Sequence, residues 1–234
     1  MCEGEWDATP LPDYIVTTGE ASRKILIGTG RYPEDKVLAG VALRQTSTAE
    51  KRREGKFEPR RLLVILSSSI EEYTKSIRFL NAALKAPTEY EVVLRPHPTM
   101  PLDAALRLLP PLTLRYRASS RASVSEDLLE SDVVLYASST IAIEAISVGL
   151  PVIYLDIGDF MNPDPLFDFS DLKWSLTEPA QLIPALKRIA ALPPSDLDRR
   201  RAAARAYALS YLTPADAAGV ATFMNLLVCY DSKP

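Results

Sequence analysis

The apolar residues of the chain follow two patterns that alternate along its main body. Short continuous apolar runs, typical of strands covered on both faces, recur between residues 62 and 156. Between them lie segments whose apolar residues recur every three or four positions, as on one face of a helix. The clearest is the segment 69–86, in which Ile70, Tyr73 and Ile77 share a face. The expected strands are 62–67, 90–95, 112–116, 132–137 and 151–156, and the expected helices are 69–86, 104–109, 123–131, 138–149, 179–192, 196–212 and 214–228.

This alternation predicts an α/β fold, a doubly wound Rossmann-like parallel sheet with helices on both faces. We place this domain at residues 62–212 and expect a C-terminal helix and tail at 213–234. Residues 45–61 are polar and charged, which indicates a linker or mobile loop. Residues 1–44 contain a shorter βαβ-like piece. Its strand, helix and second strand are expected at 13–19, 20–30 and 35–44.

Composition and charge exclude several classes of function. The 234 residues are 47% hydrophobic and 24% charged, and the net charge of −3 gives no electrostatic argument for binding nucleic acid. No apolar run approaches the ~20 residues of a membrane span, and the first residues lack the pattern of a signal peptide. Cys2 and Cys229 lie near opposite ends without metal-type spacing, which favours a reducing compartment. We therefore expect a cytoplasmic protein.

Chemically distinctive residues follow the strand expected at 90–95, where ligands of parallel sheets bind. The stretch VVLRPHP (92–98) contains His97, the only histidine of the chain. Pro96 and Pro98 restrict the backbone on both sides of it, so we expect a rigid, extended loop. A histidine held there can donate a hydrogen bond to a phosphate or a proton to a leaving group. The alternative is a capped loop with a solvent-exposed histidine.

A second group of polar residues follows the strand expected at 132–137. Ser138, Ser139 and Thr140 begin a helix and would present hydroxyls and backbone N–H groups to an anion, most often a phosphate. One of the two serines is also expected to cap the helix. The sequence therefore predicts an anion site, with plain helix capping as the alternative.

Glu144 lies one turn after Thr140, on the same helix face and among apolar neighbours. A carboxylate in such surroundings needs a partner. The vicinal hydroxyls of a ribose would serve, and so would a salt bridge to an arginine such as Arg95. Arg95 is the last residue of its expected strand and could alternatively add positive charge beside a bound phosphate.

Together these features resemble the C-terminal, donor nucleotide-binding half of a GT-B glycosyltransferase. The segment 138–152 is similar to the small-residue turn, helix, glutamate and Gly-x-Pro pattern of bacterial N-acetylglucosaminyltransferases of cell-wall synthesis. Residues 40–44 resemble their Gly-x-Pro-x-Arg motif, without its proline. In those enzymes, and in UDP-N-acetylglucosamine 2-epimerases, the glutamate that corresponds to Glu144 binds the ribose. The resemblance covers roughly residues 13 to 228.

Two further families share the order of these motifs. His97 and Pro98 resemble the His-Pro motif of bacterial sialyl- and polysialyltransferases, and residues 138–140 resemble their Ser-Ser/Thr motif. CDP-glycerol glycerophosphotransferases carry a similar Arg-Pro-His-Pro sequence and a Ser-Ser pair. The acidic tripeptide that serves the sialyltransferases as general base does not occur in this sequence.

The resemblance implies the donor-binding half of a glycosyltransferase, or of a glycerophosphate-type transferase, in surface polysaccharide synthesis. Its donor would be CMP-, CDP- or UDP-linked, and no cofactor or metal is expected, because the helix start and side chains would take the place of a metal. His97 would be the catalytic group. The residues implied in binding the donor nucleotide and phosphate are Arg95, Pro98, Ser138, Ser139, Thr140 and Glu144.

The implied partners are an acceptor glycan or lipid-linked glycan and a missing acceptor domain, supplied in cis or in trans. Residues 1–44 would be the end of that domain and the interdomain segment. The arginines of residues 199–205 could contact anionic lipid at the inner membrane face, or simply form a solvated helix face. The aspartates after the strand 151–156 could contact the transferred group, although loop and cap roles are the first expectation for them.

Two alternatives stay open. One is a nucleotide-sugar-binding or scaffolding domain without catalysis of its own. The other is a UDP-sugar epimerase-like protein, although such epimerases need further histidines and carboxylates in the cleft, and this chain has a single histidine.

Overall fold

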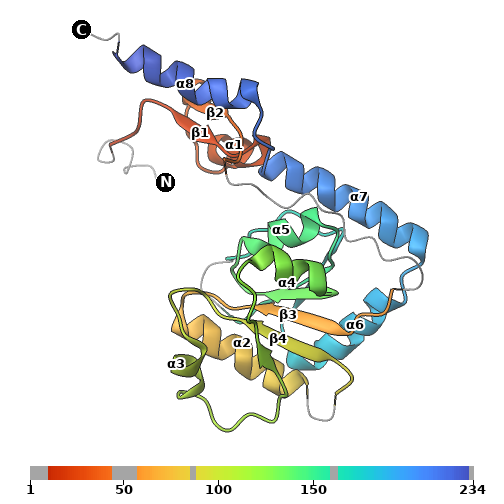
Figure 1. Ribbon diagram of the computed structural model, residues 1–234. Helices are drawn as coiled ribbons and strands as arrows, with labels where there is room; N and C mark the ends of the chain where they lie inside the picture. Colours follow the sequence, from red (N-terminus) through yellow and green to blue (C-terminus); the bar gives the residue numbers. More distant parts are fainter. Residues whose placement is uncertain (1–9, 44–56, 85–87, 159–162, 232–234) are drawn as a thin grey trace. The chain divides into compact units, whose positions relative to one another are not determined.

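The computed structural model describes residues 10–43, 57–84, 88–158 and 163–231 (Figure 1). The chain forms two compact units, one of residues 1–46 with 206–234 and one of residues 47–205. Most of the predicted linker, together with Arg44 of the Gly-x-Pro-x-Arg-like motif, lies outside the described residues. The functional division of the chain into an acceptor-domain end, a linker and a nucleotide domain stays a prediction.

The larger unit is built on a six-stranded sheet in which every neighbouring pair is parallel. Its order is β5-β4-β3-β6-β7-β8, so the strands lie in the chain order 3-2-1-4-5-6 of doubly wound nucleotide-binding sheets. The predicted α/β fold is thereby confirmed. The strands are β3 (Arg61–Ile65), β4 (Glu91–Arg95), β5 (Arg117–Ala118), β6 (Val133–Tyr136), β7 (Val152–Leu155) and β8 (Lys173–Leu176).

The central strands are apolar on both faces because helices cover both sides of the sheet. Leu62 and Leu63 of β3 and Val133 and Val134 of β6 are fully buried. In Figure 1, α4 and α5 lie over one face, and α2, α3 and α6 lie over the other. These helices are α2 (Ile70–Ala83), α3 (Leu102–Leu106), α4 (Val124–Glu130), α5 (Ile141–Ser147) and α6 (Leu182–Ala190), the last preceded by the 3₁₀ helix η2 (Pro179–Gln181).

Several predicted elements differ from the structure: the strand expected at 35–44 is limited to β2 (Val37–Ala39), and the helix expected at 104–109 is α3 at Leu102–Leu106. The strand expected at 112–116 is wrong, because its backbone is bonded to a side chain instead of a neighbouring strand: the N–H groups of Thr113 and Leu114 donate to Asn81 Oδ1 at 2.8 and 2.9 Å. The pairing follows later, in β5. The helix expected at 138–149 is shorter, since α5 has only 7 residues. The polar strand β8 was not predicted.

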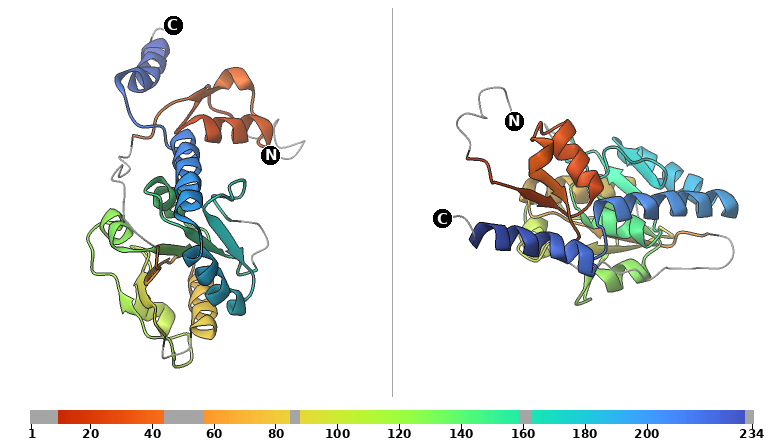
Figure 2. Two further views of the ribbon diagram at one scale, coloured as in Figure 1. Left: turned by 90° about the vertical axis from the view of Figure 1, so that its right-hand side faces the viewer. Right: turned by 90° about the horizontal axis from the view of Figure 1, so that it is seen from above.

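The smaller unit contains a two-stranded parallel sheet, β1 (Ile15–Thr17) with β2 (Val37–Ala39), joined through α1 (Glu20–Gly28) and the 3₁₀ helix η1 (Glu34–Lys36). The long helix α7 (Pro194–Tyr211) runs from the larger unit into this one, and α8 (Ala217–Asp231) follows it (Figure 2). After β2 the chain passes close to α8. A Cβ at Gly40 would lie 2.4 Å from Val16 and 3.2 Å from the ring of Phe223, so only glycine fits there.

Candidate functional site

The strand order creates a crevice between β3 and β6 at the carboxyl edge of the sheet. The chain leaves β3 toward β4 on one side and leaves β6 toward β7 on the other, and ligands of doubly wound sheets bind at such a switch point. The predicted site residues follow β4 and β6, on the two sides of β3. Neighbouring strands lie about 4.8 Å apart, so the ends of β4 and β6 lie about 10 Å apart, which a nucleotide can span.

His97 begins a tight turn directly after β4. Its carbonyl oxygen accepts a hydrogen bond from the N–H of Met100 at 2.9 Å, and Pro98 holds the second position of this turn, which its fixed φ favours. The ring is half-buried, and its Nδ1 accepts the backbone N–H of Thr99 at 3.3 Å. Nδ1 also lies 2.8 Å from Thr99 Oγ1, whose hydroxyl can donate to it; with Nδ1 accepting from both groups, the neutral ring would carry its proton on Nε2. The loop expected to be extended therefore turns at Pro98 and leaves His97 one defined N–H to donate.

Arg95, the last residue of β4, is held by structural partners. Its guanidinium pairs with the carboxylate of Asp127 in α4, which is 3% exposed, and donates to the carbonyl oxygen of Ser123 at 3.2 Å. The hydroxyl of Ser119 lies 2.8 and 2.6 Å from the two oxygens of the same carboxylate. Arg95 thus forms a salt bridge, which is the alternative role expected for it, but its partner is Asp127 instead of Glu144. A phosphate contact of Arg95 stays a prediction.

Ser138 follows β6 and is bonded to a carboxylate that the sequence reasoning did not single out. Its Oγ lies 2.7 and 2.8 Å from Oε1 and Oε2 of Glu72. Glu72 lies in the first turn of α2, where its backbone N–H donates to the capping Ser69 at 3.4 Å. The pair therefore bridges the crevice between β3 and β6. Because Ser138 has a single hydroxyl proton, which points to Glu72, that proton is not available to a phosphate while the bond lasts.

Ser139 and Thr140 stand directly before α5. Ser139 Oγ accepts the N–H of Ile141 at 3.3 Å, but the N-cap of α5 is Thr140, which is exposed and makes no side-chain capping bond, so the expected serine cap is wrong. Among the residues that the structure describes, neither hydroxyl proton has an acceptor. Their phosphate contact stays a prediction, and both hydroxyls can donate to an anion.

Glu144 lies in the first turn of α5, close to the carboxyl end of β6. The residue is half-buried, and its neighbours Ile143 and Ala145 are buried at 3% and 0% exposure. It therefore shares the carboxyl edge of the sheet with residues 138–140. Its predicted contact with a ribose stays a prediction.

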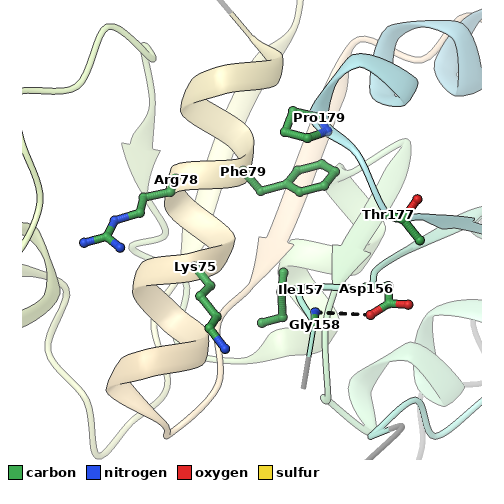
Figure 3. Close-up of a pocket in the computed structure, with 8 residues that line it drawn as sticks. All are labelled: Lys75, Arg78, Phe79, Asp156, Ile157, Gly158, Thr177 and Pro179. Atoms are coloured by element: carbon green, nitrogen blue, oxygen red, sulfur yellow. Dashed lines mark hydrogen bonds between the residues drawn. The ribbon is translucent and has the colours of Figure 1, made fainter. Parts of the chain in front are cut away.

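An open pocket of about 440 Å³ lies beside this edge, toward β7 and β8 (Figure 3). Its lining includes Lys75 and Phe79 of α2, Asp156 and Ile157 after β7, Thr177 after β8, and Pro179 of η2. In Figure 3, Lys75 and Phe79 extend from α2 toward Ile157, whereas Arg78 extends the other way. The pocket thus combines an apolar wall with charged and hydroxyl groups.

The aspartates after β7 have different surroundings. Asp164 is 5% exposed, accepts the hydroxyl of Tyr136 at 2.6 Å and pairs with Lys173 at 2.7 Å, so it is a structural loop residue. Asp159 lies outside the described residues. Asp156 is exposed, and its carboxylate accepts one hydrogen bond, from the N–H of Gly158 at 3.2 Å.

The chain is similar in fold to solved glycosyltransferases, so the prediction of a GT-B-like fold is confirmed. Among the similar solved structures, CalG4, the calicheamicin glycosyltransferase, is 18% identical with a TM-score of 0.55, over 88% of this chain and 51% of that one. The glycosyltransferase SnogD from Streptomyces nogalater is 17% identical with a TM-score of 0.54, over 90% and 56%. TarM is 13% identical with a TM-score of 0.55, over 92% and 43%.

The chain spans about half the length of these structures. At such low identity the likeness is one of fold. No protein-family model matches the sequence, and no curated protein matches it. The assignment of individual site residues therefore depends on the geometry of this chain.

Two further features concern the residues that the structure describes. No helix among them is both long and apolar enough to cross a bilayer. They contain no group of three or more His, Cys, Asp or Glu side chains that could hold a metal ion. The expectations of peripheral membrane contact and of metal-free binding stay predictions.

The structure adds Glu72 and Thr99 to the residues that sequence reasoning proposed. Both contact a proposed residue, Ser138 and His97 respectively. Thr99 could have been suspected from its place two residues after His97. Glu72 could not, because a glutamate in the first turn of a helix is favoured there by the helix dipole alone.

Proposed function

We propose that the chain is the donor-binding half of a glycosyltransferase, or of a glycerophosphate-type transferase of the same fold, that uses a nucleotide-activated donor in surface polysaccharide synthesis. The observation that carries the proposal is the position of His97, Ser139 and Glu144 around the switch point of a 3-2-1-4-5-6 sheet. The similar solved structures are glycosyltransferases, which fits this class of function.

The donor would lie across the carboxyl end of β3. Glu144 would accept hydrogen bonds from the ribose, and Ser139 and Thr140 would donate to the phosphate. His97 would donate from Nε2 to the same phosphate and stabilise the negative charge that develops on it as the bond to the transferred group breaks. CMP-, CDP- and UDP-linked donors all fit this arrangement. Arg95 would act mainly by holding α4 against β4.

The partners follow from the same proposal. A complete transferase would need an acceptor domain in cis or in trans, which would bring an acceptor glycan or lipid-linked glycan to the donor. Such a reaction would take place in the cytoplasm, at the inner face of the membrane where a lipid-linked acceptor lies. A domain that binds a nucleotide sugar without catalysis is the second candidate, because the chain spans only about half the length of the similar structures.

Calorimetry with CMP, CDP and UDP tests donor binding. His97→Ala and Glu144→Ala are each expected to weaken binding about tenfold, the effect of losing a hydrogen bond to a charged group. Glu126→Gln is a matched control, because Glu126 also lies in the first turn of a helix and accepts a serine hydroxyl, from Ser123 at 3.0 Å. If neither site change weakens binding of any of the three nucleotides, the donor site lies elsewhere. Nucleotide binding without transfer, when an acceptor domain is supplied, would favour the second candidate.

A further inference from the structure

The smaller unit buries few apolar side chains of its own. Among the residues whose burial the structure describes, those that it buries are Val37, Val41, Ala42 and Ala208. No residue of α1 is buried, although the helix contains Ile25, Leu26 and Ile27 in succession. Successive helix residues are about 100° apart, so Ile25 and Ile27 point to opposite sides of α1. The sheet of β1 and β2 can cover only one of these sides.

Helix α8 is apolar around its circumference. It has no charged residue before Asp231, its last. One side lies against the chain after β2, where a Cβ at Gly219 would be 2.1 Å from Val41. Another side carries Val220 and Met224, which are one turn apart and 39% and 54% exposed. A helix that is apolar all round is normally buried, so this second side indicates a further neighbour.

Exposed apolar side chains are concentrated in the smaller unit. Most of the large ones among the described residues belong to it, although the larger unit contains most of the chain: Tyr14, Leu43, Leu209, Val220 and Met224. Single exposed apolar residues are ordinary, but several of them in one small unit mark an interaction surface.

The backbone of β1 shows where a partner strand would pair. The C=O of Thr17 accepts the N–H of Gly40 at 3.0 Å, so the peptide groups of Thr17 face β2 and those of Val16 face the opposite side. No strand of the described residues lies on that side, because β1 and β2 form a two-stranded sheet. The outer side of β2 is partly closed, since the C=O of Val37 accepts Arg23 Nε at 2.9 Å. β1 is therefore the open edge.

The kind of partner follows from the parallel pairing. Parallel sheets are covered on both faces, and two strands are too few for independent stability. β1 and β2 are parallel and joined through α1, the unit from which doubly wound sheets are built. A second copy of the chain would present the same edge, and two identical β1 edges related by a two-fold axis would pair antiparallel. A strand that continues the parallel order must come from a different sequence.

The similar structures contain enough additional chain to supply such a sequence. This chain spans 51% of CalG4 and 56% of SnogD, so about half of each has no counterpart in it. We propose that the smaller unit binds a polypeptide of α/β architecture, in cis or in trans, which adds a parallel strand at the open edge of β1 and covers α1 and the exposed side of α8. The surface lies in the smaller unit and needs no nucleotide. Only the naming of this partner as the acceptor half rests on the proposed function.

Amide hydrogen exchange of the full chain, followed by NMR, tests the open edge. The N–H of Val16 is expected to exchange about tenfold faster than that of Gly40, which is bonded to Thr17. Sedimentation velocity gives the oligomeric state of the same sample. Equal protection of the two amides in a monomer would show that the edge is already closed. Equal protection in a dimer would assign the surface to a second copy. Either result would overturn the proposal.

Photo-crosslinking in the cells that naturally produce the protein tests the partner. A benzoylphenylalanine in place of Tyr14, directly before β1, and one in place of Met224 are each expected to crosslink to the same polypeptide segment, in which apolar strand and helix patterns alternate. The same group in place of Leu108, a similarly exposed residue of the larger unit, is the matched control and should not capture it.

Three crosslinking results would contradict the proposal: no crosslink at all, crosslinks only to another copy of this chain, or different proteins captured from positions 14 and 224. A crosslink within one longer polypeptide would mean that the partner is supplied in cis, and a crosslink to a separate α/β protein that it is supplied in trans. Failure of nucleotides to bind in calorimetry would contradict only the donor site, because that site lies in the larger unit.

Discussion

The hydroxyl of Ser138 donates to both carboxylate oxygens of Glu72, at 2.7 and 2.8 Å, and so ties the loop after β6 to the first turn of α2. The two elements meet at the point where the sheet reverses its strand order. A carboxylate therefore holds one of the three hydroxyls that the sequence analysis assigned to a phosphate. The switch point therefore carries the negative charge of Glu72 beside the hydroxyl residues 138–140, a charge that these residues alone do not reveal.

Glu72→Gln is expected to strengthen the binding of a plain nucleotide. The change removes a negative charge next to the phosphate, which should increase the affinity for CMP or CDP about fivefold. Calorimetry at low and high salt measures it, and the gain should shrink at high salt because ionic screening weakens the repulsion in the unchanged chain. Glu126→Gln should leave the affinity unchanged. Equal affinities for Glu72→Gln and the unchanged chain would mean that the phosphate does not approach Ser138.

The neutral ring of His97 is expected to occur as a single tautomer. Because Nδ1 accepts the N–H of Thr99, the neutral ring should be protonated at Nε2. Nitrogen-15 NMR of the side chain distinguishes the two tautomers. Thr99→Val, which removes the hydroxyl 2.8 Å from Nδ1 but keeps the N–H, should preserve this tautomer, and so should Thr99→Ser, which keeps both groups. A ring protonated only at Nδ1 in the unchanged chain would contradict the assignment and, with it, the proposed contact to phosphate.

Arg95→Ala is expected to destabilise the fold rather than act only on ligand binding. It would leave the carboxylate of Asp127 buried without its cation, which typically costs about 3–5 kcal/mol of unfolding free energy. Urea unfolding measures the loss. The double change Arg95→Ala with Asp127→Ala should recover part of it, because no charge is then left unpaired. Arg107→Ala, at an exposed position, is the control. A stability equal to that of the unchanged chain would show that Arg95 is free to serve a ligand.

Tyr73→Phe is expected to raise stability. Tyr73 is fully buried in α2, and its hydroxyl has no hydrogen-bond partner among the described residues. Removing an unsatisfied buried hydroxyl should add about 1 kcal/mol to the unfolding free energy.

Burial, together with the nearby carboxylate of Asp103, raises the pKa of Tyr73 to about 12. The unfolded chain loses this proton near pH 10, so stability should fall between about pH 10 and the folded value, and the phenylalanine variant should lack that part of the fall.

The ionisation of Glu91 is expected to make the stability of the fold depend on pH in the acid range. The hydrogen bond from Arg117 at 2.7 Å, assisted by Arg61 at 2.9 Å, lowers the pKa of Glu91. Its ionised form therefore stabilises the fold above the unfolded pKa, about 4.3, and the contribution disappears as pH falls through the lower folded value. Glu91→Gln should be less stable than the unchanged chain at neutral pH and equal to it in strong acid, by urea unfolding. Glu89→Gln, whose pair with Arg60 spans 3.7 Å, should change little.

The sequence was sufficient for the central fold because each buried strand is a short apolar run. The apolar run of Leu62, Leu63 and Val64 predicts a strand by itself. Helices cover both faces of the sheet, which explains why polar and apolar residues do not alternate along this strand. The strand expected at 112–116 failed because its apolar residues pack into the core while the side chain of Asn81 takes the backbone N–H groups. β8 was not predicted because its sequence, KWSL, has no apolar run.

The candidate site was predictable in part for a similar reason. Strand ends and short motifs are local features, so His97, Ser139 and Glu144 could be proposed from their positions. The partners of these residues are not local. Glu72 and Ser138 are joined only by the crossing of the chain from β3 to β6, and the pairing of Arg95 with Asp127 depends on where α4 packs. Such contacts decide which groups remain available to a ligand.

The central position of β3 also has a consequence for folding kinetics. β3 pairs with β4 after a local connection, but its other neighbour is β6, and Leu62 and Val133 are about 70 residues apart along the chain. Closing that long loop is entropically costly, so the β3–β6 pairing should form late, after the β3–α2–β4 segment has associated. The crevice does not exist before that step. Nucleotide binding should therefore appear only in the last phase of refolding, and would serve as a sensitive measure of whether the sheet has closed.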